Sequence, residues 1–139
     1  MKKFTKMFND ICDLVFKLYL YADMTKMIHY STESNHCHEL CDTVRDSINE
    51  FADSLAEQYF GYHGKPSFSD LTVKHDVSEI DDLGMLCKTV AGMTDELRKQ
   101  IESDSKLQNL VSLIDDFKGD MEKDMFLATF DKVSNAKGN

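Results

Sequence analysis

The chain has 139 residues, a length that suits one domain with its own hydrophobic core and is short for two. Apolar residues make up 42% of it, while one Pro and six Gly are too few for a turn-rich all-β chain, so a mostly helical fold is favoured. A formal charge of -9 repels a phosphate backbone and argues against nucleic acid as a partner. Without an apolar run of roughly 18 residues or a leader, the chain is predicted to be cytoplasmic, with no membrane partner.

Apolar residues recur every three or four positions along four segments, which predicts four helices. The first thirty residues form one amphipathic helix. A second helix follows the polar segment 31–35 and runs to about Phe60, where Gly61 is expected to end it. The third covers Leu83–Ile101 and the fourth, after a short polar turn, covers Leu107–Met125.

The connection from Gly61 to Ser78 is the longest in the chain, holds the only Pro and shows no sustained period. Helices joined by short, long and short links predict an all-α, ferritin-like four-helix bundle with one long crossover connection between the second and third helices. A plain up-down-up-down bundle with a floppy middle loop is the alternative. We predict a single domain over residues 1–133 and a flexible tail over 134–139.

A second apolar stripe is predicted on the first helix, consisting of Met7, Leu14, Tyr21 and Ile28. Between Leu14 and Ala22 the only charged residue is Lys17, so this part of the helix is apolar on more than one side. A monomer would leave the second stripe in water. The helix is therefore predicted to be covered by its own bundle on one side and by another subunit on the other.

Metal-competent side chains concentrate on the second helix, at His36, His38, Asp42, Asp46, Asp53 and Glu57. His38 and Asp42 are four residues apart, a spacing that lets two side chains hold one ion from a single helix face. Asp53 and Glu57 share that spacing. Both pairs fall in a stripe about 100° wide that points away from the apolar face of the helix. The alternative is that this stripe is simply the solvated face of an acidic helix.

Asp53 lies eleven positions after Asp42, or roughly 16 Å along a helix, which is too far for one ion to contact both pairs. A two-fold-related, antiparallel copy of the helix would bring His38 and Asp42 of one subunit beside Asp53 and Glu57 of the other. Mixed imidazole and carboxylate ligands suit Fe, Mn or Zn more than Ca or Mg. The sequence therefore predicts a metal site between the subunits of a homodimer or a larger homo-oligomer.

The four cysteines, Cys12, Cys37, Cys41 and Cys87, lack the spacing of a disulfide framework and are predicted to be reduced thiols. Cys37 and Cys41 beside His36 and His38 suggest a zinc cluster as another interpretation. On a helical wheel both thiols point about 100° or more away from Asp42, and no second Cys pair follows. We therefore assign them to the core.

At these residues the sequence resembles the Dps group of mini-ferritins. Their ligand pattern is a His that ends the first helix, then His-x3-Asp, ten residues, and Asp-x3-Glu on the second helix. The matching residues here are His29, His38, Asp42, Asp53 and Glu57, with the ten-residue gap kept. His29 lies nine residues before His38, closer than in Dps proteins. This shorter spacing is similar to that of uncharacterised ferritin-like proteins encoded by tailed bacteriophages.

The resemblance implies an intersubunit di-iron site. The ligand types would also suit Mn or Zn, and no organic cofactor is expected. The resemblance implies that His29, His38 and Asp42 come from one subunit and Asp53 and Glu57 from its mate. It also implies oxidation of Fe(II) by peroxide or oxygen, which is ferroxidase activity. Glu-x-x-His triplets of the larger ferritins' intrachain site are missing from the third and fourth helices. The alternative function is a phage-type helical interaction protein that binds a host or partner protein without metal chemistry.

Overall fold

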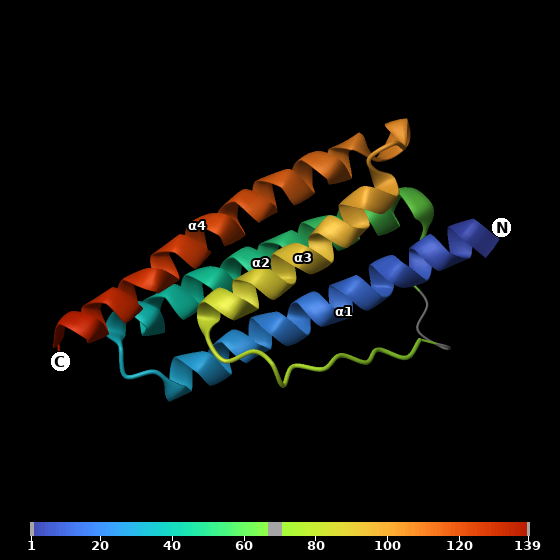
Figure 1. Ribbon diagram of the computed structural model, residues 1–139. Coiled ribbons are helices and arrows are strands. Elements are labelled where there is room, and N and C mark those ends of the chain that lie inside the picture. The colour runs from blue at the N-terminus through green and yellow to red at the C-terminus, as the bar shows by residue number, and fades with distance from the viewer. Residues whose placement is uncertain (1, 67–70, 139) are drawn as a thin grey trace.

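The computed structural model describes residues 2–66 and 71–138, with side chains for 6–66 and 71–130 (Figure 1). It is all-α, with four helices packed as a bundle, which confirms the predicted fold class at this level. The helices are α1 (Lys2–Ser31), α2 (Asn35–His63), α3 (Leu83–Ile101) and α4 (Gln108–Gly138), and the short 3-10 helix η1 (Ser105–Leu107) precedes α4.

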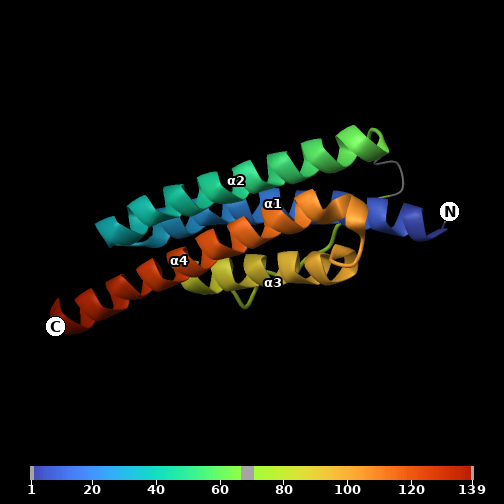
Figure 2. The same ribbon diagram turned by 90° about the horizontal axis from the view of Figure 1, so that it is seen from above.

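Every helix in the bundle runs antiparallel to its neighbours. α1 packs on α2 and α3, and α4 packs on the same two helices from the other side. α2 and α3 lie diagonally opposite and run in the same direction (Figures 1 and 2). The link between them returns along the bundle, and its residues 71–82 run beside α1, where the His75 ring lies 5.1 Å from that of Tyr21. The up-down-up-down alternative, in which α2 and α3 would be antiparallel, is wrong.

Polar side chains and one glycine set the helix ends. Ser34 caps α2 by accepting a hydrogen bond from the Cys37 amide, and Asp82 caps α3 by accepting one from the Met85 amide. α2 ends near the predicted position at Gly61, but Gly61 itself is helical and the helix continues to His63. Gly64 ends it with a φ of 112°, a conformation that favours glycine.

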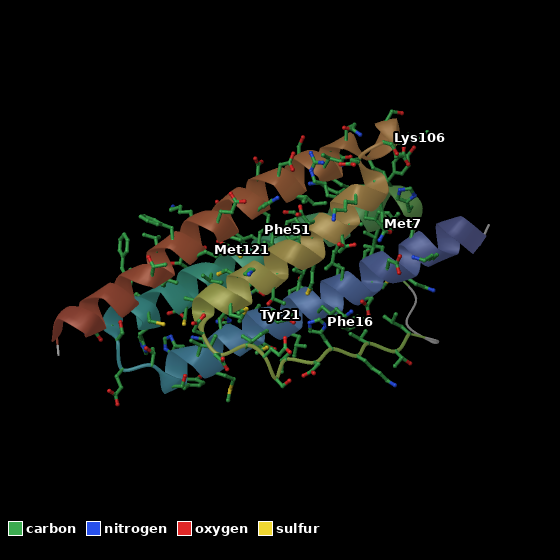
Figure 3. The ribbon with its side chains drawn as sticks, viewed as in Figure 1. Met7, Phe16, Tyr21, Phe51, Lys106 and Met121 are labelled. Atoms are coloured by element: carbon green, nitrogen blue, oxygen red, sulfur yellow. The ribbon has the colours of Figure 1, made fainter. Side chains whose placement is uncertain are left out.

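Side chains from all four helices fill the core. Figure 3 labels Tyr21 of α1, Phe51 of α2 and Met121 of α4, each of which is buried. Phe51 stacks on Phe117 with the ring centroids 4.1 Å apart, which joins α2 to α4. The second stripe predicted on α1 is wrong, since Leu14 and Tyr21 are buried in this same core.

The backbone of α4 is helical to Gly138 and so passes through the segment predicted as a flexible tail. Side chains after residue 130, and residue 139 itself, lie outside the described part, and the boundary at residue 133 stays a prediction. None of the helices, over the residues described, is long and apolar enough to cross a membrane. All four cysteines are free thiols, as predicted, and three of them are buried.

Each helix also buries a hydroxyl, thiol or carboxyl group in the half of the core nearer the α1–α2 turn, among them those of Thr25, Cys41, Cys87 and Asp124. The Thr25 hydroxyl donates a hydrogen bond to the Ala22 carbonyl of its own helix. Asp124 is 3% exposed and has no hydrogen bond or ion pair among the described side chains, and this burial raises the pKa of its carboxyl. Burial, helped by the charge of Asp124, also raises the pKa of the Cys87 thiol to about 12.

Replacing Asp124 by Asn should stabilise the protein at neutral pH, because a neutral side chain avoids burying an unpaired carboxylate. Since the pKa of Asp124 is raised by folding, its favourable contribution exists below the ordinary Asp value of about 3.9 and is lost as the pH rises through the folded-state pKa. Urea unfolding should show the advantage of Asp124→Asn shrinking from about pH 7 to about pH 4.5. An equal difference at both pH values would contradict this assignment.

Candidate metal centre

The tight turn between α1 and α2 brings three of the predicted ligands together. His29 lies in the last turn of α1, His38 in the first turn of α2, and Asp42 one turn further along α2. The imidazole rings of His29 and His38 are 3.4 Å apart between centroids. Nδ1 of His29 lies 3.7 Å from Oδ1 of Asp42. We call these three residues the histidine half of the candidate site.

Backbone carbonyls hold both imidazoles in one orientation. Nδ1 of His29 lies 3.0 Å from the carbonyl oxygen of His38, and Nδ1 of His38 lies 3.3 Å from the carbonyl oxygen of His29. Because a carbonyl can only accept, Nδ1 of each ring carries the proton and donates it. In the neutral rings Nε2 then keeps its lone pair, which is the arrangement typical of metal-binding histidines.

A lysine forms an ion pair with the carboxylate of the histidine half. Nζ of Lys26, on α1, lies 3.1 Å from Oδ1 of Asp42 and donates a hydrogen bond to it. This bond is the main reason why the pKa of Asp42 lies below its ordinary value, and the nearby charges of Lys26, His29 and His38 act in the same direction. The Asp42 carboxylate is therefore held in its charged, ligand-competent form. Lys26 was not predicted, although it lies three residues before His29 and thus on a neighbouring position of the helix.

Asp53 and Glu57 lie about three to four turns further along α2 and are exposed. We call them the carboxylate half. Both charges act on the hydroxyl of Tyr19 on α1, and together with the larger effect of burial they raise its pKa. Neither carboxylate forms an ion pair with a Lys or Arg among the described side chains. No three His, Cys, Asp or Glu residues in the described part of one chain form a group that could hold a metal ion.

His36 and His38, which the sequence could not tell apart as ligands, have different surroundings. Nε2 of His36 lies 2.9 Å from the carbonyl oxygen of Leu127, and its ring stacks on Phe130 at 6.0 Å. His36 thus joins the start of α2 to α4. Only His38 lies beside His29 and Asp42, so the geometry favours His38 as the ligand.

The exposed apolar surface on α1 consists of other residues than the predicted second stripe. We call it the outer stripe, and it consists of Phe16, Tyr19, Leu20, Met27 and Tyr30, each 40% to 74% exposed. On a helical wheel these side chains fall within about 100° of one another, opposite the buried face of α1. The helix does have two apolar faces, as predicted, but Leu14 and Tyr21 belong to the inner one.

No family model matches the chain, and neither a curated protein nor a solved structure is found to match it. The fold established here is therefore a four-helix bundle without a family assignment. Any functional assignment depends on the chemistry of the two halves and on the likeness of their spacing to the Dps pattern.

His36→Ala should lower the free energy of unfolding by about 1 kcal/mol, because it removes a hydrogen bond and leaves the Leu127 carbonyl without it. Urea denaturation measures the change, with Glu39→Ala on the exposed face of α2 as the control that should be near neutral. If His36→Ala were as stable as the parent protein, the α2–α4 contact would have no energetic role.

Proposed function

We propose that the protein is a ferritin-like bundle that binds a transition metal, with iron as its substrate, at a site shared by two copies of the chain. One copy supplies the histidine half, His29, His38 and Asp42, and the other supplies the carboxylate half, Asp53 and Glu57. The observation that carries the proposal is the orientation of the two imidazoles by reciprocal backbone contacts. In this orientation Nε2 of each neutral ring keeps the lone pair that a metal ion needs.

The path of the chain supports the ferritin-like assignment. A bundle whose neighbouring helices are all antiparallel, with one long crossover between the second and third, is the arrangement of ferritin-like folds. Other four-helix proteins can share this topology, so it supports the scaffold and not the chemistry.

The outer stripe supports the presence of a second copy. Tyr19 belongs to this stripe, and the charges of both residues of the carboxylate half raise its pKa. The two surfaces therefore adjoin. An isologous dimer, in which each stripe packs on the same stripe of its mate, would remove three aromatic rings per chain from water. Because the histidine and carboxylate halves lie at different levels of α2, a two-fold axis between them would bring unlike halves together.

The residues explain how Fe(II) would be bound and oxidised. Nε2 of His29 and His38 supplies neutral nitrogen ligands, and the carboxylates of Asp42, Asp53 and Glu57 supply charge that favours Fe(III) over Fe(II). Two Fe(II) ions deliver the two electrons that reduce one hydrogen peroxide, with two protons, to two waters. Mn or Zn would fit the same mixed ligand set.

A specific observation favours the second candidate, a protein that binds a host or partner protein without metal chemistry. Phe126 and Phe130 on α4 are 63% and 45% exposed and contact each other edge to face at 5.1 Å. Aromatic residues are enriched at the cores of protein interfaces. This pair lies on α4, away from the outer stripe on α1, so the two functions need different surfaces.

Asp53→Ala should weaken Fe(II) or Zn(II) binding by more than about 100-fold, since loss of a ligand exceeds the 10- to 100-fold effect of losing a residue that only orients one. It should also lower the mass of the metal-loaded protein toward that of a monomer. Elemental analysis after desalting, combined with light scattering, measures both.

Asp46→Ala is the matched control, because Asp46 is exposed on the same face of α2 but lies outside the motif. It should change neither metal content nor mass. If both variants behaved like the parent protein, the stripe would be only a solvated acidic face.

Lys26→Met should strengthen metal binding by about two- to fivefold, the scale of an exposed ion pair, because Asp42 would no longer hold an ammonium group that the metal must displace. Competition with a chelator measures this affinity. Lys6→Met, which breaks the exposed Lys6–Asp10 pair elsewhere on α1, should leave it unchanged. Weaker binding in Lys26→Met would show that Lys26 supports the site instead of competing for it.

A further inference from the structure

Tyr19 stands out among the exposed aromatic residues because its hydroxyl is tied electrostatically to one half of the proposed site. It is 41% exposed and belongs to the outer stripe of α1. The carboxylate half has no ion-pair partner among the described side chains, whereas the histidine half is held by Lys26 and by two backbone carbonyls. Tyr19 is thus the polar group on α1 from which the carboxylate half could receive comparable support.

Helix geometry places Tyr19 beside this half independently. The pairing of α1 with α2 is fixed at one end by Lys26 and Asp42, and at the other by Phe8 and Phe60, whose rings are 5.3 Å apart. Interpolating between these contacts puts Tyr19 opposite a point about one helical turn before Asp53. Side chains on a helix lean toward its N-terminus, which for α1 is the direction of Asp53 and Glu57 on the antiparallel α2.

The chemistry of the pair is that of a donor beside acceptors. The Tyr19 phenol carries its proton at neutral pH and can donate it in a hydrogen bond. Ionised carboxylates can only accept hydrogen bonds. Carboxylates that bind metals are generally oriented by hydrogen bonds from neighbouring residues.

We propose that Tyr19 is a positioning residue of the carboxylate half: its hydroxyl donates a hydrogen bond to Asp53 or Glu57 when a second copy closes over the outer stripe. This inference rests on the proposed metal site. The ring of Tyr19 would pack in the outer stripe against the second copy, and its hydroxyl would contact the carboxylate half.

Tyr19→Phe tests this role, because it removes the hydroxyl and keeps the ring. With Zn(II) as a redox-inert probe, binding to Tyr19→Phe should be about 10- to 100-fold weaker than to the parent protein, while the mass in solution and the thermal midpoint stay the same. Tyr62→Phe, an exposed tyrosine near the C-terminal end of α2, is the control and should bind Zn(II) like the parent. Isothermal titration calorimetry gives the affinities.

Tyrosine emission supplies a second readout that a purely structural role would not change. The chain has five Tyr and no Trp, so its intrinsic fluorescence comes from tyrosine. Zn(II) should alter this emission more in the parent and in Tyr62→Phe than in Tyr19→Phe, where the remaining change comes from Tyr30 beside His29. Unchanged affinity in Tyr19→Phe would overturn the role of Tyr19 and leave the metal site standing. Failure of the parent protein to bind Zn(II) or Fe(II) would overturn the proposed function itself.

Discussion

The antiparallel register of α1 against α2 is the constraint on which the candidate site depends. A turn of only three residues, ended by the Ser34 cap, forces the end of α1 against the start of α2. In that register the two imidazoles meet and each is held by the other residue's carbonyl. The same register carries Lys26 to Asp42 and, further along, Tyr19 toward Asp53. A shift by one residue would turn the histidines to different faces.

Exposure to solvent explains how α2 carries so many carboxylates without losing stability. The acids of the proposed site lie on the outer face of α2, where water screens them, and over the described side chains only Asp42 is paired with a lysine. Asp124 is the exception, because it is buried in the core and has no hydrogen-bond or ion-pair partner among the side chains that the structure describes. Its burial raises the pKa of its carboxyl. An uncompensated acidic face is costly to cover with another protein surface unless cations accompany it, which agrees with a metal between two copies.

The helices could be predicted from the sequence because their apolar spacing is regular, and the long link between α2 and α3 was evident from its turn residues. Other features depend on how the helices pack, which the spacing of apolar residues does not predict. Gly61 and Gly64 lie one turn apart and both suit a helix end, so choosing between them requires the backbone conformation. A wheel shows that α1 has two apolar faces but not which one the bundle buries. The pairing of Lys26 with Asp42 could not be predicted without the register of α1 against α2. The distance between the histidine half and the carboxylate half of one site depends on how a second chain packs.

The central claim is that one site is built from two chains, and complementation of two defective variants tests it most directly. His38→Ala breaks the histidine half and Asp53→Ala breaks the carboxylate half, so neither variant alone should retain Zn(II). A hybrid dimer, co-expressed with two different tags and purified through both, would contain one intact site and one doubly broken site. The account predicts that the hybrid retains half of the parent protein's Zn(II) per dimer. A hybrid that assembles but retains none would contradict a site shared between subunits.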